Sequence, residues 1–206
     1  MLVRFLLAAA LIATGCSRKE NPETKITKEG VDVNKDPLGM ISAIASAGKE
    51  AEEWQKELEK MPATDAVHFS KLIEALPAAP SGWTASEPRG SINQMGDFKT
   101  SHADRTYTKE GTNERVEVSF DDWAFNRTIY LPFIMSAKFS QESTDGYNKG
   151  ITIGKDPGRE EYRIKSKSGS RIVLIKKRYH AKVDIDNLGQ EAFEEWWGRL
   201  NVGALP

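Results

Sequence analysis

The chain has 206 residues, with 29 Lys and Arg against 30 Asp and Glu, so its formal net charge is −1. A hydrophobic fraction of 39% with 29% charged residues is too apolar for a disordered chain and too polar for a protein with many membrane spans. The near-zero charge argues against a nucleic-acid partner. One cysteine and three histidines exclude a disulfide scaffold and argue against a Cys/His zinc cluster, so we expect neither a metal nor another cofactor.

Residues 1–15 have the pattern of a secretory signal. One positive charge, Arg4, precedes the apolar run Phe5–Ala13, and small residues follow it. Nine apolar residues are less than half of the roughly 20 that a membrane-spanning helix needs, so we expect a cleaved signal peptide rather than a span.

The residues at the end of this segment, Ile12-Ala13-Thr14-Gly15-Cys16, resemble the lipobox of bacterial lipoproteins, with Ala13 in place of the usual leucine. The resemblance implies that the Cys16 sulfur receives a diacylglyceryl group and that the signal is cut before this residue. It also implies, through Ser17 and for a Gram-negative source, an outer-membrane anchor with the protein facing the periplasm. Several acyl chains anchor a protein stably without a membrane-spanning helix. The alternative is an ordinary secretory signal in which Cys16 is incidental.

Two segments are expected between the signal and the main domain. Residues 16–36 are polar, mixed in charge and nearly free of large apolar side chains, which predicts a flexible tether after the lipidated cysteine. Residues 37–61 have apolar side chains at three- and four-residue steps, which predicts a long amphipathic helix. That helix either docks on the domain or pairs with a partner or a second copy of the chain.

Residues 64–206 are expected to form one α+β domain. The pattern predicts a short helix after Thr64 or Asp65, and later helices near Ala124–Phe139 and Asn187–Leu200. About six strands are predicted between them, at Trp83–Glu87, Phe98–Thr108, Arg115–Asp121, Gly150–Ile153, Arg159–Lys165 and Arg171–Ile185. This order favours a mainly antiparallel sheet packed with helices.

The spacing of turn and packing residues in this domain resembles a group of uncharacterised bacterial exported proteins. The residues that match are Leu76-Pro77, Pro80, Gly82-Trp83, Ser101, Ala103, Tyr107, Val116, Val118, Asp121, Gly146-Tyr147, Pro157-Gly158 and Glu161-Tyr162. The resemblance implies a recurring domain with no assigned activity. At the level of fold, a Mog1/PsbP-like architecture is compatible with this pattern, and such a likeness transfers no function.

The sequence contains no convincing catalytic constellation. Ser101, His102 and Asp104 are close in sequence, but on a strand the serine faces away from the other two, which argues against a triad. The aspartates Asp121, Asp122, Asp184 and Asp186 lie at strand ends, where such residues commonly cap the following element. We therefore expect a protein that is not an enzyme.

The most strongly charged element is a basic hairpin within residues 163–182. It either protects a sheet edge from aggregation, or meets an acidic protein or anionic glycan, or contacts anionic lipid head groups. Two tryptophans are added as contact candidates because aromatic and Arg side chains dominate interface energies. The contact candidates are Arg171, Lys176, Arg178, Lys182, Trp83 and Trp123.

Together these patterns predict a lipid-anchored, periplasm-facing protein with a non-catalytic binding domain. Its partners would be the membrane, through the Cys16 lipid, and a protein or an anionic glycan. Two alternatives remain open, a carrier of lipid or another small molecule and a hydrolase of the cell envelope.

Overall fold

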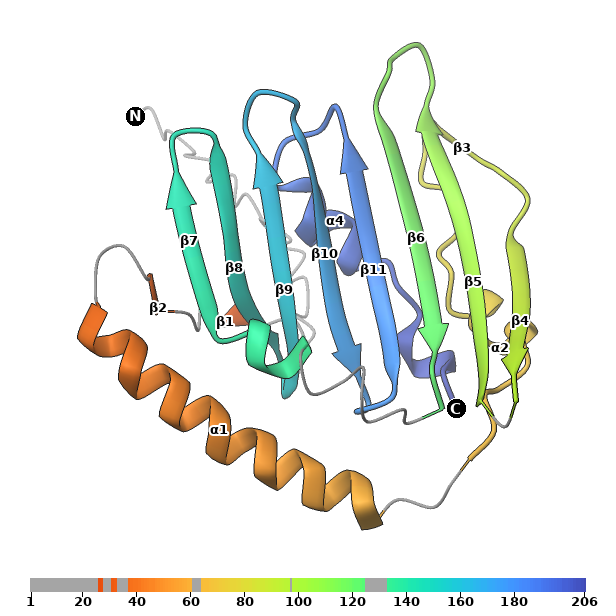
Figure 1. The fold of residues 1–206 in the computed structure, drawn as a ribbon. Coiled ribbons are helices and arrows are strands. Elements are labelled where there is room, and N and C mark those ends of the chain that lie inside the picture. Colours follow the sequence, from red (N-terminus) through yellow and green to blue (C-terminus); the bar gives the residue numbers. More distant parts are fainter. Residues whose placement is uncertain (1–25, 28–30, 33–36, 61–63, 97, 125–132) are drawn as a thin grey trace, which may run out of the picture.

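Eleven strands form one hydrogen-bonded sheet in the computed structural model, which describes residues 26–27, 31–32, 37–60, 64–96, 98–124 and 133–206 (Figure 1). The strands are β1 (Ile26–Thr27), β2 (Val31–Asp32), β3 (Trp83–Ala85), β4 (Arg89–Met95), β5 (Phe98–Lys109), β6 (Arg115–Asp122), β7 (Phe139–Ser143), β8 (Gly146–Ile153), β9 (Asp156–Arg163), β10 (Ser168–Ile175) and β11 (Tyr179–Asp186). The helices are α1 (Pro37–Lys60), α2 (Phe69–Ile73) and α4 (Ala192–Trp197), with a 3-10 turn at Val202–Ala204 and a helical turn at residues 133–136.

The sheet consists of two antiparallel meanders. β7 to β11 follow one another across the sheet, and β4 to β6 do the same, with the two halves joined where β11 pairs with β6. β3 pairs with β5 on the same side as β4, and the short β2 pairs in parallel with β7. The expected α+β class with a mainly antiparallel sheet is therefore correct, whereas the expected number of about six strands is wrong.

One reason for the low strand count is that the predicted strand Arg171–Ile185 is a hairpin. β10 and β11 are joined by Lys176, Lys177 and Arg178, and both lysines have positive φ, at 53° and 56°. Ile175 pairs with Tyr179 across this three-residue connection, so the odd-numbered residues of both strands lie on one face of the sheet. The alternation of side chains between the two faces is therefore the same before and after the turn, and the sequence reads as one long strand.

One face of the sheet forms the hydrophobic core. Val116, Val118 and Phe120, which alternate with polar residues along β6, are completely buried. Trp196 of α4 packs on this face against Trp83 and Tyr107, with ring centroids 5.0 and 4.7 Å away. α4 is shorter than the predicted Asn187–Leu200, because its regular turns begin only at Ala192 and end at Gly198.

The opposite face of the sheet is polar over most of its area, and among the described residues the helical segments packed on it are α1 and the turn at residues 133–136. In Figure 1, α4 lies behind β10 and β11, while α1 runs along the lower end of the front face. Trp54 of α1, 8% exposed, packs there with Ile134 and Leu174, and Lys177 lies 5.0 Å from its ring. α1 thus occupies the range in which the sequence predicts a helix, and at Trp54 it docks on the domain.

The predicted tether is partly ordered. Ile26 and Thr27 pair with Ile153 and Thr152 of β8, and β2 pairs with Phe139 and Ser140 of β7. Backbone hydrogen bonds to a sheet can order a polar segment that buries little apolar surface, a source of order that composition does not reveal. The tether is therefore wrong as a description of these four residues. The expected signal peptide and Cys16 lie outside the described residues.

Candidate functional site

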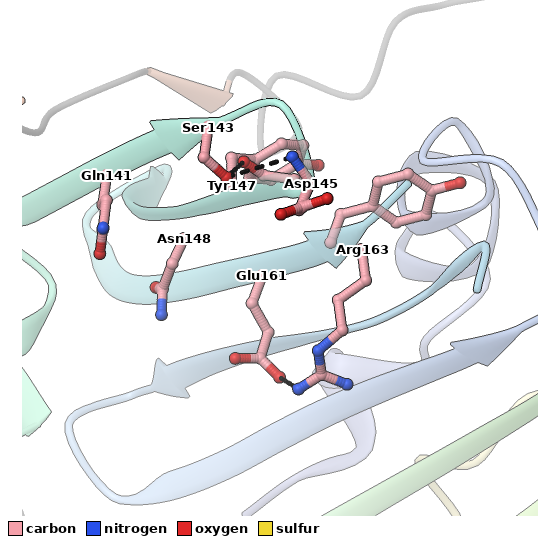
Figure 2. Close-up of a pocket in the computed structure, with 9 residues that line it drawn as sticks. Gln141, Ser143, Asp145, Tyr147, Asn148, Glu161 and Arg163 are labelled. Atoms are coloured by element: carbon pink, nitrogen blue, oxygen red, sulfur yellow. Dashed lines mark hydrogen bonds and ion pairs between the residues drawn. The ribbon is translucent and has the colours of Figure 1, made fainter. Parts of the chain in front are cut away.

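A hollow of about 310 Å³ lies over β7, β8 and β9, at the end of the sheet away from α1 (Figure 2). Gln141, Asn148 and Glu161 occupy one row across these strands, because Gln141 pairs with Asn148 and Asn148 with Glu161. Arg163 lies two residues further along β9, so it shares their face. We call this site the β7–β9 hollow; it is lined by Gln141, Ser143, Asp145, Gly146, Tyr147, Asn148, Glu161, Tyr162 and Arg163.

Two arginines orient the polar groups of this row. Arg159 Nε donates to Asn148 Oδ1 at 2.6 Å, which leaves the amide nitrogen of Asn148 available as a donor. Arg163 Nη2 donates to Glu161 Oε1 at 3.3 Å, so the second carboxylate oxygen of Glu161 can accept another hydrogen bond. A donor and an acceptor therefore stand on neighbouring strands, and Glu161 remains 40% exposed.

Close approach of β8 and β9 forms the base of the hollow. Gly146 has a φ of 150°, and a Cβ at this position would lie 2.0 Å from the carbonyl oxygen of Tyr162. The rings of Tyr147 and Tyr162 lie on the core face of the sheet, with their centroids 6.0 Å apart. The Tyr147 hydroxyl donates to Glu160 Oε1 at 2.7 Å. The tyrosines therefore support the floor, while the amides and charged groups face outward.

The contact candidate Arg171 is a structural residue. Its side chain is 2% exposed, and Nε donates to Glu160 Oε2 at 2.6 Å while Nη2 donates to Glu194 Oε1 at 2.7 Å. Its guanidinium also lies 5.3 Å from the ring of Phe193. Arg171 thus joins the sheet to α4, and its assignment as a contact residue is wrong because the odd-numbered positions of β10 face the core.

The other basic candidates do not form one surface either. Lys176 Nζ donates to the carbonyl of Leu205, and Arg178 binds the Asp122 carboxylate at 2.9 and 2.7 Å and the Asp65 carbonyl at 3.0 Å. Lys182 is on the polar face, 38% exposed, and pairs with Asp184 at 2.6 Å. The basic side chains predicted within residues 163–182 are therefore divided by a turn, and several of them are held in internal ion pairs.

The two tryptophan candidates lie on opposite faces of the sheet. Trp83 meets Trp196 edge to face in the core, whereas Trp123 lies 4.2 Å from the ring of His180 on the polar face. Both side chains are half-buried. Packing accounts for the position of each.

The carboxylates considered for catalysis do not converge. Asp122 is fully buried and accepts from the backbone of Ala124 at 2.9 Å and of Val67 at 2.8 Å. Residues 125–132 lie outside the described part of the chain, so capping of a helix that follows Asp122 stays a prediction. Asp121 binds His102, and Asp184 binds Lys182. Ser101 is buried on the core face, away from His102, as strand alternation predicts. Among the described residues, no group of three His, Cys, Asp or Glu side chains is arranged to hold a metal ion.

Sequence reasoning did not single out the polar row of the hollow. Gln141, Asn148 and Glu161 lie on three strands, and only their register brings them together. The sequence does place polar side chains at alternate positions of residues 159–163, but the same pattern is typical of any strand with one face in solvent.

No protein-family model, curated protein or solved structure matches this chain. Within the part of the chain that the structure describes, no helix is both long and apolar enough to cross a membrane.

Proposed function

We propose that this protein is a lipid-anchored, non-catalytic binding module of the cell envelope, and that the β7–β9 hollow is its ligand site. The observation on which this rests is the polar row Gln141, Asn148 and Glu161 on the polar face of the sheet, at the end away from α1. Planar amide and carboxylate groups in one row, already oriented by neighbouring guanidinium groups, form a prepared hydrogen-bonding surface.

The ligand class that matches this surface is a glycan. Sugar hydroxyls both donate and accept, and the hollow offers the Asn148 amide donor beside the Glu161 acceptor. Arg163, whose side chain is 67% exposed, adds a cation that can meet a sugar carboxylate. A glycan also agrees with the periplasm-facing location that the lipobox resemblance implies.

The proposed anchor brings the hollow close to the membrane. From Cys16 to Ile26, where the chain joins β8, ten residues span at most about 35 Å. The hollow lies at the other end of β8, roughly 23 Å further along the strand. A lipidated Cys16 would hold the ligand site within about 60 Å of the outer membrane, on its periplasmic side.

The two alternatives have less support. A lipid carrier needs an apolar cavity, but the hollow beside α1, of about 530 Å³, is lined by Lys49, Glu53, Glu57, Lys155 and Lys177 together with Ser46 and Trp54. A hydrolase needs converging titratable groups, and Asp121, Asp122 and Asp184 bind three separate partners, His102, Arg178 and Lys182.

The binding proposal is tested by calorimetry with soluble cell-wall glycan fragments. We expect Asn148→Ala and Glu161→Ala each to weaken binding by about tenfold, as loss of one or two hydrogen bonds implies. The matched control is Glu117→Ala, a carboxylate on the same face of β6 that pairs with Arg115 outside the hollow. No saturable binding by the unmodified protein, or equal losses in all three variants, would reject the site.

The anchor is tested separately by acyl-chain labelling and membrane fractionation of the full-length chain. Cys16→Ala should abolish labelling and release the protein from the membrane fraction. Unchanged labelling or fractionation of this variant would show that Cys16 is not the anchor.

A further inference from the structure

The strand β4 forms one edge of the sheet (Figure 1). Among the described residues it pairs with β5 alone, whereas β2 pairs with part of β7 at the opposite edge. Proteins commonly protect an edge strand with Lys, Pro, a β-bulge or a covering segment, because its outer backbone groups can bind another strand. From Arg89 to Met95, β4 has neither Lys nor Pro, and its pairing with β5 runs without a bulge.

The backbone groups of β4 that face away from β5 belong to Gly90, Ile92 and Gln94. Ser86 N donates to Thr106 O at 2.8 Å, so the even-numbered residues of β5 direct their backbone groups to the side of β3 and β4. The register pairs these residues with the odd-numbered residues of β4. Because backbone groups alternate between the two sides of a strand, the even-numbered residues of β4 direct their N–H and C=O groups outward.

These outward positions are self-complementary. When two copies of β4 lie antiparallel with Ile92 opposite Ile92, Gly90 of each copy stands opposite Gln94 of the other. Every one of these residues faces the partner strand, so each pair can exchange two backbone hydrogen bonds. Gly90 and Gln94 are exposed and Ile92 is half-buried, which leaves the backbone at this edge accessible.

The side chains are compatible with the same register. Arg89, the one charged residue of β4, is paired with Asp104 within its own sheet at 2.6 Å and stands opposite Met95 of the second copy. Ser91 stands opposite Asn93, and both are exposed and uncharged. The register therefore brings no like charges together, which would otherwise destabilise the pairing.

We propose that two copies of this protein pair through β4, so that their sheets join into one continuous sheet. A second copy fits this edge better than an unrelated strand, because the outward backbone groups and the charges match under a two-fold axis. That axis is perpendicular to the sheet, so it keeps the polar faces of both copies on the same side. The pairing involves no residue of the β7–β9 hollow, and the dimer carries two such hollows on one face.

Register-specific disulfide formation in the full-length chain tests the pairing. Ser91 and Asn93 of the second copy form a non-hydrogen-bonded pair with Cα atoms about 4.5 Å apart, within the range of a disulfide. A mixture of the Ser91→Cys and Asn93→Cys variants should therefore form a disulfide-linked heterodimer. Each variant alone should form far less, because its own two-fold mate is about 8 Å away, too far for a disulfide. The unmodified protein, whose only cysteine is Cys16, measures the background.

Sedimentation equilibrium of the full-length chain in density-matched detergent gives a second test. Gln94→Pro removes an outward N–H but no hydrogen bond to β5, so it should weaken dimerisation by about tenfold or more. Gln94→Ala loses the same side chain and keeps the N–H, so it should dimerise like the unmodified protein. Thermal unfolding of both variants shows whether each is folded.

Three results would overturn the inference. The first is an unmodified protein that sediments as a monomer at every concentration. The second is a mixture of cysteine variants that forms no more disulfide than each variant alone, which would exclude the proposed register. The third is equal dimerisation of Gln94→Pro and the unmodified protein, which would show that a dimer uses another surface.

Discussion

The two faces of the sheet obtain their stability in different ways. On the core face, Val118, Phe120 and Val183 are fully excluded from water and pack beneath α4. On the polar face, cations pair with acids two residues away on the same strand, as in Arg115–Glu117, Arg163–Glu161 and Lys182–Asp184. Exposed ion pairs contribute little to stability. The core face therefore supplies most of the stability of the fold, and the exposed ion pairs of the polar face supply little.

The largest expected effect is on the core face, from Trp196→Ala. This side chain is 1% exposed and contacts Trp83 and Tyr107, so its loss leaves a cavity and should lower the free energy of unfolding by about 3–5 kcal/mol. Urea denaturation measures the change. A loss below about 1 kcal/mol would contradict the assignment of this face as the core.

Arg171→Met should have the next largest effect. It leaves Glu160, 3% exposed, with only Lys149 and Tyr147 as partners, and breaking a buried ion pair costs about 3 kcal/mol or more. Thermal unfolding of this variant beside Glu160→Gln and the double variant measures the coupling. Additive losses in the double variant would show that the two side chains do not act as a pair.

Gly146→Ala should disturb the floor of the hollow. The new Cβ would meet the Tyr162 carbonyl at 2.0 Å, so β8 and β9 must separate, at a cost of about 1–3 kcal/mol. Gly111→Ala is the matched control, because Gly111 also has positive φ, at 73°, but has open space around its Cβ position. Equal decreases in the free energy of unfolding of the two variants would mean that the positive φ alone, and not the contact with the Tyr162 carbonyl, disfavours a side chain at residue 146.

The smallest effect is expected from Lys182→Ala on the polar face. Its pair with Asp184 is partly exposed, so the free energy of unfolding should change by less than about 0.5 kcal/mol. Chemical denaturation at low and high salt checks this. A larger, salt-sensitive loss would show that the polar face also stabilises the fold.

The sequence predicts the core face better than the polar face. The alternation Val116, Val118, Phe120 and the stripe of Phe193, Trp196 and Trp197 place these residues correctly, because burial imposes a regular pattern. β4, by contrast, consists mostly of polar residues and Gly, which are also typical of loops, and pairing with β5 makes it a strand.

The candidate site depends on register, which the sequence does not specify. Asn148 and Glu161 are neighbours because β8 and β9 turn between Ile153 and Asp156, and a change of this register by one residue would put the two side chains on opposite faces of the sheet. Arg171 was predicted wrongly for the same reason. Its charge suggested a surface contact, but its position along β10 turns the side chain to the core face, against Glu160 and α4.

The most direct test of the account is a two-dimensional NMR titration of the protein with soluble cell-wall glycan fragments. If the polar face is the ligand surface, the shifts should cluster at Gln141, Asn148, Glu161 and Arg163, with the amides of α4 unchanged. Shifts concentrated on α4 and α2, or none at saturating glycan, would contradict the central claim that the uncovered face of this sheet binds the ligand.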